Sequence, residues 1–279
     1  MPDTLVLFTT YLALVKGLSV GSISNYLAGI RQEHLRSGYD LPTPTTYFPL
    51  KTALQGAKRF LSRPVRQKLP ISPALLSRLV AATGWGSVWR CLLLTLWVTF
   101  SQLASLVPTV GREIFSPNHH LAWQHLSFRP DSVKITLVKT KTIQCSERRL
   151  TFVVPRHSNP SFCLLTHLLA WQTASPAPFL HHPVFVLPAH QPHCAYTPVN
   201  RRLADAFLKA ALEVVGADVT RYSWSSFRRG SATSYYLASG DVESLRVHGD
   251  WCSQAYTRYL SLPATARVGV VSTVQSLLK

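Results

Sequence analysis

A change in hydrophobic periodicity is the feature that most restricts the fold of this chain. In the stretch SVKITLVKTKTIQCSERRLTFVVP, residues 132–155, apolar residues alternate with polar ones over 133–137 and again over 150–154. Alternation with a period of two is typical of β-strands, whereas much of the sequence on either side follows the 3.6-residue period of helices. The sequence therefore predicts a mainly α-helical fold with a small antiparallel β hairpin, whose tip carries basic residues.

The helical segments have recognisable starts and ends. Residues 22–37 place apolar side chains at helical spacing and precede Gly38, a natural helix stop. Ser72 followed by Pro73 is a typical helix start. Helices are also expected over 3–16, 49–62, 87–104, 162–173, 198–215 and 226–238, in a short segment from Asp241 to near Gly249, from Ser253, and over 264–278.

A basic, proline-rich stretch divides the chain. SRPVRQKLPISP, residues 62–73, has the composition of a linker. We therefore expect a small helical domain over 1–65 and a larger domain over 66–279. A basic linker between two domains suits a protein that closes around a polyanion, although a solvated loop would have the same composition.

The charge of the chain points to its partner. The formal net charge is +17, from 29 Lys and Arg against 12 Asp and Glu. Such an imbalance favours a polyanionic partner, of which nucleic acid is the commonest. A membrane surface is the rival, but the basic residues are spread over the whole chain and no basic amphipathic helix stands out.

The apolar segments do not indicate membrane insertion. The start, MPDTLVLFTTYLALVKG, lacks the basic region and cleavage site of a signal peptide. The apolar run over 91–100 is far shorter than the ~20 residues that span a bilayer. We expect an intracellular protein without a membrane partner, located in the nucleus if DNA is its partner.

Metal and disulfide chemistry are not indicated. Five cysteines, at positions 91, 145, 163, 194 and 252, are scattered without a CxxC motif. This usage is typical of a reduced protein without a Cys-rich zinc site. The pairs His119–His120 and His181–His182 are adjacent residues, which is poor spacing for joint ligation on a helix. No metal and no cofactor are predicted.

Residues 225–260 read SSFRRGSATSYYLASGDVESLRVHGDWCSQAYTRYL. This stretch resembles the end of a tyrosine recombinase (phage-integrase-type) catalytic domain, and more narrowly the recombinases of DIRS-like and Crypton-like eukaryotic mobile elements. The family pattern is close to H-S-F-R-R-G-x-A-T, then G-D-W, then a tyrosine near the end of the next short helix. VKTKTIQ (138–144) resembles the hairpin that carries the family lysine, and FSQLASLVP (100–108) the segment that usually reads F-x-R-x-S-x-L-V-P.

The resemblance covers nearly the whole chain, because SISNYLAGIRQEH in the helical front is similar to the core-binding domain of the family. It implies a two-domain architecture: a helical core-binding DNA-binding domain and an α+β catalytic domain. It also implies double-stranded DNA as the partner, a tetramer on DNA, and metal-free strand cleavage through a 3′-phosphotyrosyl bond. Two arginines would clamp the phosphate and a lysine would protonate the leaving 5′ oxygen.

The family roles are carried over to matching positions. Tyr259 matches the nucleophile, with Tyr256 as the alternative, and Arg228 matches the second clamp arginine. Trp251 matches the His or Trp position, but the spacing to the tyrosine is one residue short, so His248 or Asp250 are alternatives at that corner. Lys141 matches the hairpin lysine, with Lys139 as the alternative. The further DNA contacts expected are Arg229, Lys58, Arg59, Arg63, Arg66, Lys68 and Lys139.

Two positions depart from the family pattern. Gln102 stands where the first clamp arginine is expected, and Ser225 stands where a histidine precedes Arg228 by three residues. Glutamine has no charge, and serine takes no proton near neutral pH. By analogy with other phosphoryl-transfer enzymes, losing the arginine costs ~10³–10⁵ in rate, and losing a general base costs ~10²–10⁴. Neither Arg90 nor Arg112 matches the vacant arginine position.

Three functions remain open from the sequence. The first is a recombinase of mobile-element origin that binds DNA but has lost most strand cleavage. The second is an active recombinase that tolerates both changes. The third is a protein-interaction module that does no DNA chemistry.

Overall fold

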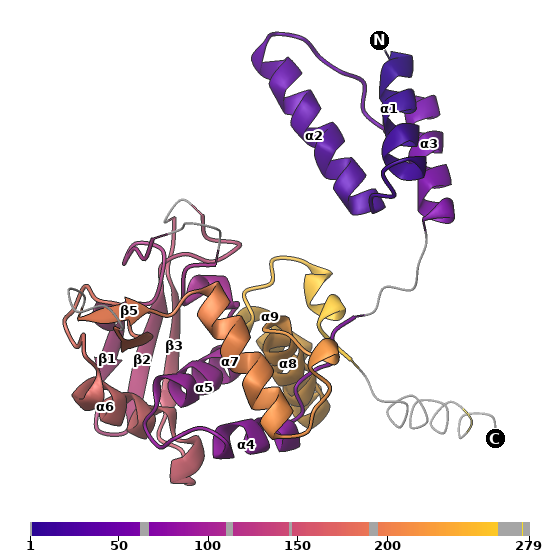
Figure 1. Ribbon diagram of the computed structural model, residues 1–279. Coiled ribbons are helices and arrows are strands. Elements are labelled where there is room, and N and C mark those ends of the chain that lie inside the picture. The colour runs from indigo at the N-terminus through magenta and orange to yellow at the C-terminus, as the bar shows by residue number, and fades with distance from the viewer. Residues whose placement is uncertain are drawn as a thin grey trace. The chain divides into compact units, whose positions relative to one another are not determined.

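The computed structural model describes residues 2–61, 67–109, 114–144, 147–189, 195–261 and residue 275. The chain divides into two compact units, Met1–Arg66 and Gln67–Lys279 (Figure 1). This boundary lies one residue from the division expected from the linker composition. The helix expected over 264–278 falls almost entirely outside the described residues.

The first unit is a bundle of three helices. Leu12, Ala13, Ile23 and Ala57 form its buried core. The helix predicted over 22–37 is confirmed, and Gly38 after it has a left-handed φ of 81°. The helices are α1 (Pro2–Leu14), α2 (Val20–Arg36) and α3 (Phe48–Phe60).

The second unit surrounds one hydrophobic core with helices and a small sheet. The Ser72 side chain accepts a hydrogen bond from the Leu75 amide and caps the helix that begins at Pro73, as the sequence predicts. None of the described helices has the length and hydrophobicity to cross a bilayer. The helices are α4 (Pro73–Ala81), α5 (Val88–Thr99), α6 (Leu164–Ala174), α7 (Arg201–Val214), α8 (Ser225–Ser239) and α9 (Val242–His248).

The predicted hairpin is confirmed and belongs to a three-stranded antiparallel sheet. Strand β2 (Ser132–Leu137) pairs with β3 (Leu150–Pro155), so that Ile135 lies opposite Phe152 and both side chains are buried. A third strand, β1 (Leu126–Phe128), pairs with β2 and is too short for its periodicity to be visible in the sequence. Strands β4 (Val186–Pro188) and β5 (Tyr196–Pro198) form a separate pair.

Helix α5 is buried at most of its positions and crosses the centre of this unit beside α6 and α8 (Figure 1). The helix predicted over 87–104 is too long, because α5 ends at Thr99 and Phe100 takes a left-handed φ of 50°. The Phe100 carbonyl accepts a hydrogen bond of 2.6 Å from Arg228. The Arg228 side chain therefore stabilises a turn at Phe100 that the apolar pattern of the sequence does not predict.

The segment that opens the second unit lies against α8. The Ile71 amide donates to the Ser226 carbonyl at 2.9 Å, and the Leu69 amide donates to the Arg221 carbonyl at 2.7 Å. A Cβ on Gly230 would lie 2.0 Å from the Ile71 carbonyl oxygen. Only glycine permits this approach, which explains the last residue of the SSFRRG motif.

Candidate active site

A cleft of about 230 Å³ opens on the second unit. Its walls come from the turn after α5, the loop between β2 and β3, helix α8 and the segment after α9. It contains four of the predicted catalytic residues and one of the two departures from the family pattern. These residues are Gln102, Lys141, Arg228, Trp251 and Tyr259.

Arg228 is the electrostatic centre of the cleft. Its two terminal nitrogens donate hydrogen bonds of 2.6 Å to the carbonyls of Phe100 and Gly249. Its Nε is buried and has no partner among the described residues. Burial lowers the pKa of the Arg228 guanidinium, an effect that Tyr259 and Asp250 oppose through their charges. Arginine stays protonated in proteins, so the cleft holds a fixed positive charge with donors to spare.

Tyr259 lies beside this charge. It follows the short 3₁₀ helix Gln254–Arg258, which the Ser253 side chain caps. Its ring centre is 5.2 Å from the Arg228 guanidinium, and its hydroxyl accepts a hydrogen bond of 3.5 Å from the Gln102 side-chain amide. Tyr256, the alternative nucleophile, does not line the cleft. Gln102 thus lies next to the tyrosine hydroxyl without supplying a charge.

Trp251 forms the floor beneath the arginine. The residue is 7% exposed, and the Arg228 guanidinium lies 4.4 Å from the ring centre. A cation over an indole ring contributes about 0.5–2 kcal/mol. The ring folds back over Gly249, where a Cβ would meet ring atoms at 1.9–2.5 Å. Close packing of the Trp251 ring therefore requires glycine at position 249 of the Gly-Asp-Trp motif.

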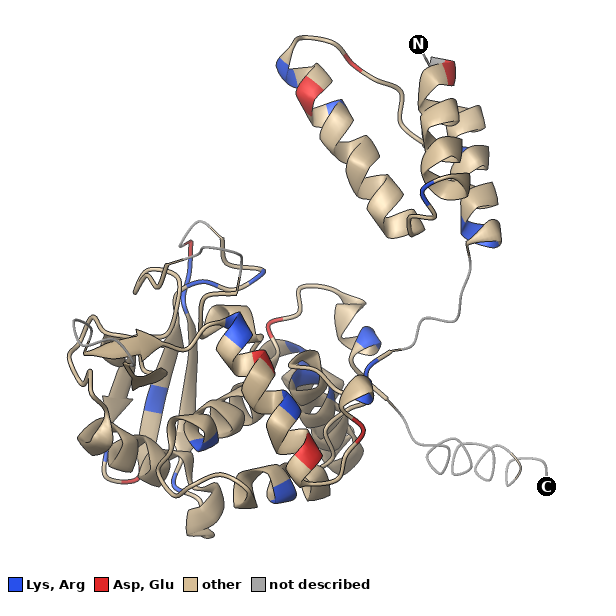
Figure 2. Cartoon of the chain, viewed as in Figure 1, with Lys and Arg blue, Asp and Glu red and all other residues tan. Residues whose placement is uncertain are grey.

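Lys141 lines the cleft from the loop between β2 and β3, whereas Lys139 does not. Basic residues gather in this loop, as the blue segments above β2 and β3 show (Figure 2). The sequence left the choice between the two lysines open, and their placement favours Lys141.

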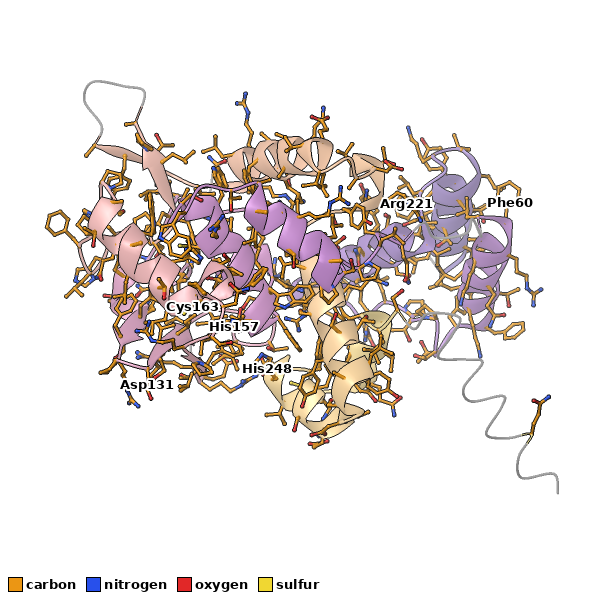
Figure 3. All side chains as sticks on the ribbon, turned by 90° about the horizontal axis from the view of Figure 1, so that it is seen from below. Phe60, Asp131, His157, Cys163, Arg221 and His248 are labelled. Atoms are coloured by element: carbon orange, nitrogen blue, oxygen red, sulfur yellow. The ribbon has the colours of Figure 1, made fainter. Side chains whose placement is uncertain are left out.

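His248 does not reach the cleft. It is the last residue of α9 (Figure 3). Its Nε2 donates to the Val98 carbonyl at 2.8 Å, and its ring packs against Phe100 and Phe152. Burial lowers the pKa of the His248 imidazole, and the positive charge of Arg228 adds to the effect. This partly exposed histidine lines a second groove, whereas Trp251 and Asp250 line the cleft.

Ser225 is the other departure, and it lies outside the cleft. It is the first residue of α8, is exposed, and its hydroxyl lies 2.8 Å from the hydroxyl of Ser223. Arg90 is also remote from this chemistry, because its guanidinium is buried and donates to Thr83 and to the Val80 carbonyl. Arg112 lies outside the described residues.

The predicted DNA-contact residues come from both units. Arg229 is half-buried and donates to the Gln67 side chain at 2.6 Å, while Lys68 donates to the Thr220 carbonyl. Lys58 and Arg59 lie in the last turn of α3, in the first unit. Arg63 and Arg66 fall outside the described residues.

The sequence did not predict that Asp250 contacts the loop between β2 and β3. The Asp250 carboxylate accepts a hydrogen bond of 2.6 Å from Arg148 and a second one from Thr142. The sequence separation of about a hundred residues hides these contacts. No group of three or more potential metal ligands occurs in the part of the chain that the structure describes.

The mainly helical fold with its small antiparallel sheet matches that of tyrosine recombinase catalytic domains. The structure is similar to XerA recombinase, with a TM-score of 0.53 and 11% identity over 98% of each chain. It is also similar to the Tn1549 transposon integrase, solved in complex with circular intermediate DNA. That match has a TM-score of 0.54 and 13% identity, and covers 95% of this chain and 84% of the integrase chain. No family model and no curated protein matches the sequence. At these identities the likeness establishes the fold.

Proposed function

We propose that this protein binds double-stranded DNA and derives from a tyrosine recombinase of a mobile element, of the DIRS-like or Crypton-like kind. In this proposal its capacity for strand cleavage is reduced or lost. The fold and the formal charge of +17 support a DNA partner. We further propose nuclear localisation and assembly as a tetramer on DNA.

One observation carries the proposal: the guanidinium of Arg228 is largely enclosed, yet no carboxylate of the described residues bonds to it directly. Two backbone carbonyls orient it, and its Nε has no partner among the residues described. A buried polar group without a partner is costly unless a ligand satisfies it. A phosphate offers charge and acceptor oxygens in the geometry that arginine binds best.

The remaining groups of the cleft suit phosphoryl transfer to tyrosine. The Tyr259 oxygen would attack the phosphorus as its hydroxyl proton passes to solvent water, and would release the 5′ oxygen, which takes a proton from Lys141. The phosphotyrosyl bond would retain the energy of the broken phosphodiester, so the strand could be rejoined without an external energy source. Trp251 would support the phosphate clamp by fixing the plane of the Arg228 guanidinium.

Two features favour weak activity. Gln102 lies next to Tyr259 but supplies one neutral donor in place of a charged fork. Loss of a clamp arginine is expected to reduce the rate by ~10³–10⁵. Ser225 offers no proton acceptor near neutral pH and is bonded to Ser223.

DNA binding is tested with a mixed-sequence duplex over a range of salt concentrations. We expect measurable affinity at low salt and a steep, linear fall of log K with log salt, because each neutralised phosphate releases counterions. Arg229, Lys58, Arg59, Arg63, Arg66, Lys68 and Lys139 are the proposed phosphate contacts. Absence of binding even at low salt would favour a protein-interaction module instead.

Strand cleavage is tested separately with a pool of nicked duplexes that trap covalent adducts. Wild-type protein should form adducts slowly, and Gln102→Arg should accelerate them by orders of magnitude. Tyr259→Phe should abolish them, with Tyr256→Phe as the matched control. Equal, rapid adduct formation by wild type and Gln102→Arg would identify a fully active recombinase and refute the loss of activity.

A further inference from the structure

The geometry points to Asp250 as a positioning residue that holds the loop bearing Lys141 over the cleft. The inference rests on the proposed function, since it concerns how one of the proposed catalytic groups is kept in place. The Asp250 carboxylate would not contact the phosphate; it would act by holding the loop in place.

The first argument is the backbone at the end of α9. The Trp251 amide donates to the Arg246 carbonyl at 3.0 Å, and the Asp250 amide donates to the Val247 carbonyl at 3.1 Å. These two bonds define a Schellman motif with Asp250 at its left-handed position. Glycine is usual there, and Asp250 has a φ of 54°. A side chain at this position carries a conformational cost, so its presence calls for a compensating contact.

The second argument is what the carboxylate contacts. Oδ1 accepts from Arg148 Nη2 at 2.6 Å, and Oδ2 accepts from the Thr142 hydroxyl. Only 12% of the Asp250 side chain is exposed, against 42% of the Arg148 side chain. Both oxygens are therefore engaged, and a charged acceptor strengthens each bond.

The third argument is where these partners lie. Thr142 directly follows Lys141 on the outgoing side of the loop between β2 and β3, and Arg148 lies on the returning side. One carboxylate thus joins both sides of the loop to the segment after α9. Within the loop, the Gln144 side chain donates to the Lys141 carbonyl at 3.0 Å, and Ile143 is buried.

Three successive residues after α9 then organise the cleft. The Gly249 carbonyl orients Arg228, Asp250 holds the Lys141 loop, and the Trp251 ring supports the guanidinium. Because Arg228 is bonded to Gly249 and Phe100 and not to Asp250, loss of the carboxylate should release the loop without removing the clamp arginine.

Hydrogen exchange of the full chain without DNA tests the contact. Asp250→Gly removes the carboxylate and also relieves the left-handed backbone, so it should leave α9 intact. We expect amides of the loop over 139–144 and 147–149 to exchange about ten- to a hundredfold faster, while those of α8 and α9 are unchanged. Asp250→Asn, which tolerates the same backbone and keeps one acceptor, should give an intermediate acceleration. Unchanged loop exchange in Asp250→Gly, or equal acceleration in α9, would overturn the inference.

A double-mutant cycle separates positioning from a general structural role. Arg148→Ala and Asp250→Gly should each accelerate loop exchange, and the double variant should exchange no faster than the faster single variant. Additive effects would show that the two residues act independently and would contradict the proposal.

The link to Lys141 is read from DNA binding. Lys141→Ala should reduce the slope of log K against log salt by about one phosphate contact. Asp250→Gly should reduce it similarly, and should have no further effect in the Lys141→Ala background. A full additional loss in that background would refute action through Lys141. Failure of the wild-type protein to bind DNA would refute the proposed function. The loop contact would still be tested, because the hydrogen-exchange measurement contains no DNA.

Discussion

Replacement of Gly230 by alanine sets two physical effects against each other. Gly230 lies inside α8, where alanine normally stabilises a helix by about 1 kcal/mol because it restricts the unfolded chain. A Cβ at this position would, however, lie 2.0 Å from the Ile71 carbonyl oxygen and 2.9 Å from the Ile71 carbonyl carbon. The obstacle is backbone, so rotation of a side chain cannot relieve it.

The cost follows from what must move. Separation to ordinary contact requires a shift of more than 1 Å between α8 and the segment that contains Ile71. That segment is bonded to Ser226, and Ile71 is fully buried. Loss of the hydrogen bond costs about 1 kcal/mol, and overpacking adds about 1–3 kcal/mol. After the gain of about 1 kcal/mol from the helix propensity of alanine is subtracted, we expect a net loss of about 1–3 kcal/mol.

Thermal and urea unfolding of the second unit measure this effect. For a domain of about 200 residues, the expected loss corresponds to a fall in Tm of roughly 2–12 °C. Gly56→Ala is the matched control, because Gly56 lies within α3 and its Cβ would meet nothing within 4 Å. That variant should stabilise the first unit by about 0.5–1 kcal/mol. A Gly230→Ala protein at least as stable as wild type would refute the packing argument.

Three further predictions concern single contacts. Arg229→Ala should destabilise the second unit by about 1–2 kcal/mol in urea unfolding, because it removes the bond to Gln67; no change would assign Arg229 to solvent. His248 has a lowered pKa in the fold, whereas the unfolded chain takes up its proton near pH 6.5, so stability should fall as the pH drops below about 6.5. His248→Gln should flatten that dependence in unfolding measured from pH 7.5 to 5, and an unchanged slope would contradict the argument. Ser72→Ala should cost about 1 kcal/mol by loss of the cap on the Leu75 amide, and Ser72→Gly only a few tenths; equal costs would argue against the cap.

Much of the secondary structure was predictable because its signals are local. The alternation over 133–137 and 150–154 identified two paired strands, and Gly240 ends α8 in the left-handed conformation that favours glycine. Asp241 likewise caps α9, accepting from the Ser244 amide. Such patterns depend on residues within a few positions of one another.

The expected helix over 87–104 shows where local reasoning fails. Its apolar character continues to Val107, yet α5 ends at Thr99 because Phe100 turns into the left-handed conformation and bonds to Arg228. The partner lies 128 residues away in the sequence. Hydrophobicity predicts burial in this segment correctly, but not the turn that directs Gln102 toward the cleft.

The sequence by itself determined the kinds of group available for chemistry: a tyrosine, an arginine, a tryptophan and a basic hairpin in an order that resembles a known family, with Gln102 and Ser225 as its departures. Only the tertiary structure decided which of these groups meet. It brought Gln102 to within 3.5 Å of the Tyr259 hydroxyl, left Ser225 at the surface, and joined Asp250 to the hairpin loop. The physical reason is that residue types and periodicity are properties of neighbouring positions, whereas a cleft is formed by packing between segments that are distant in the chain.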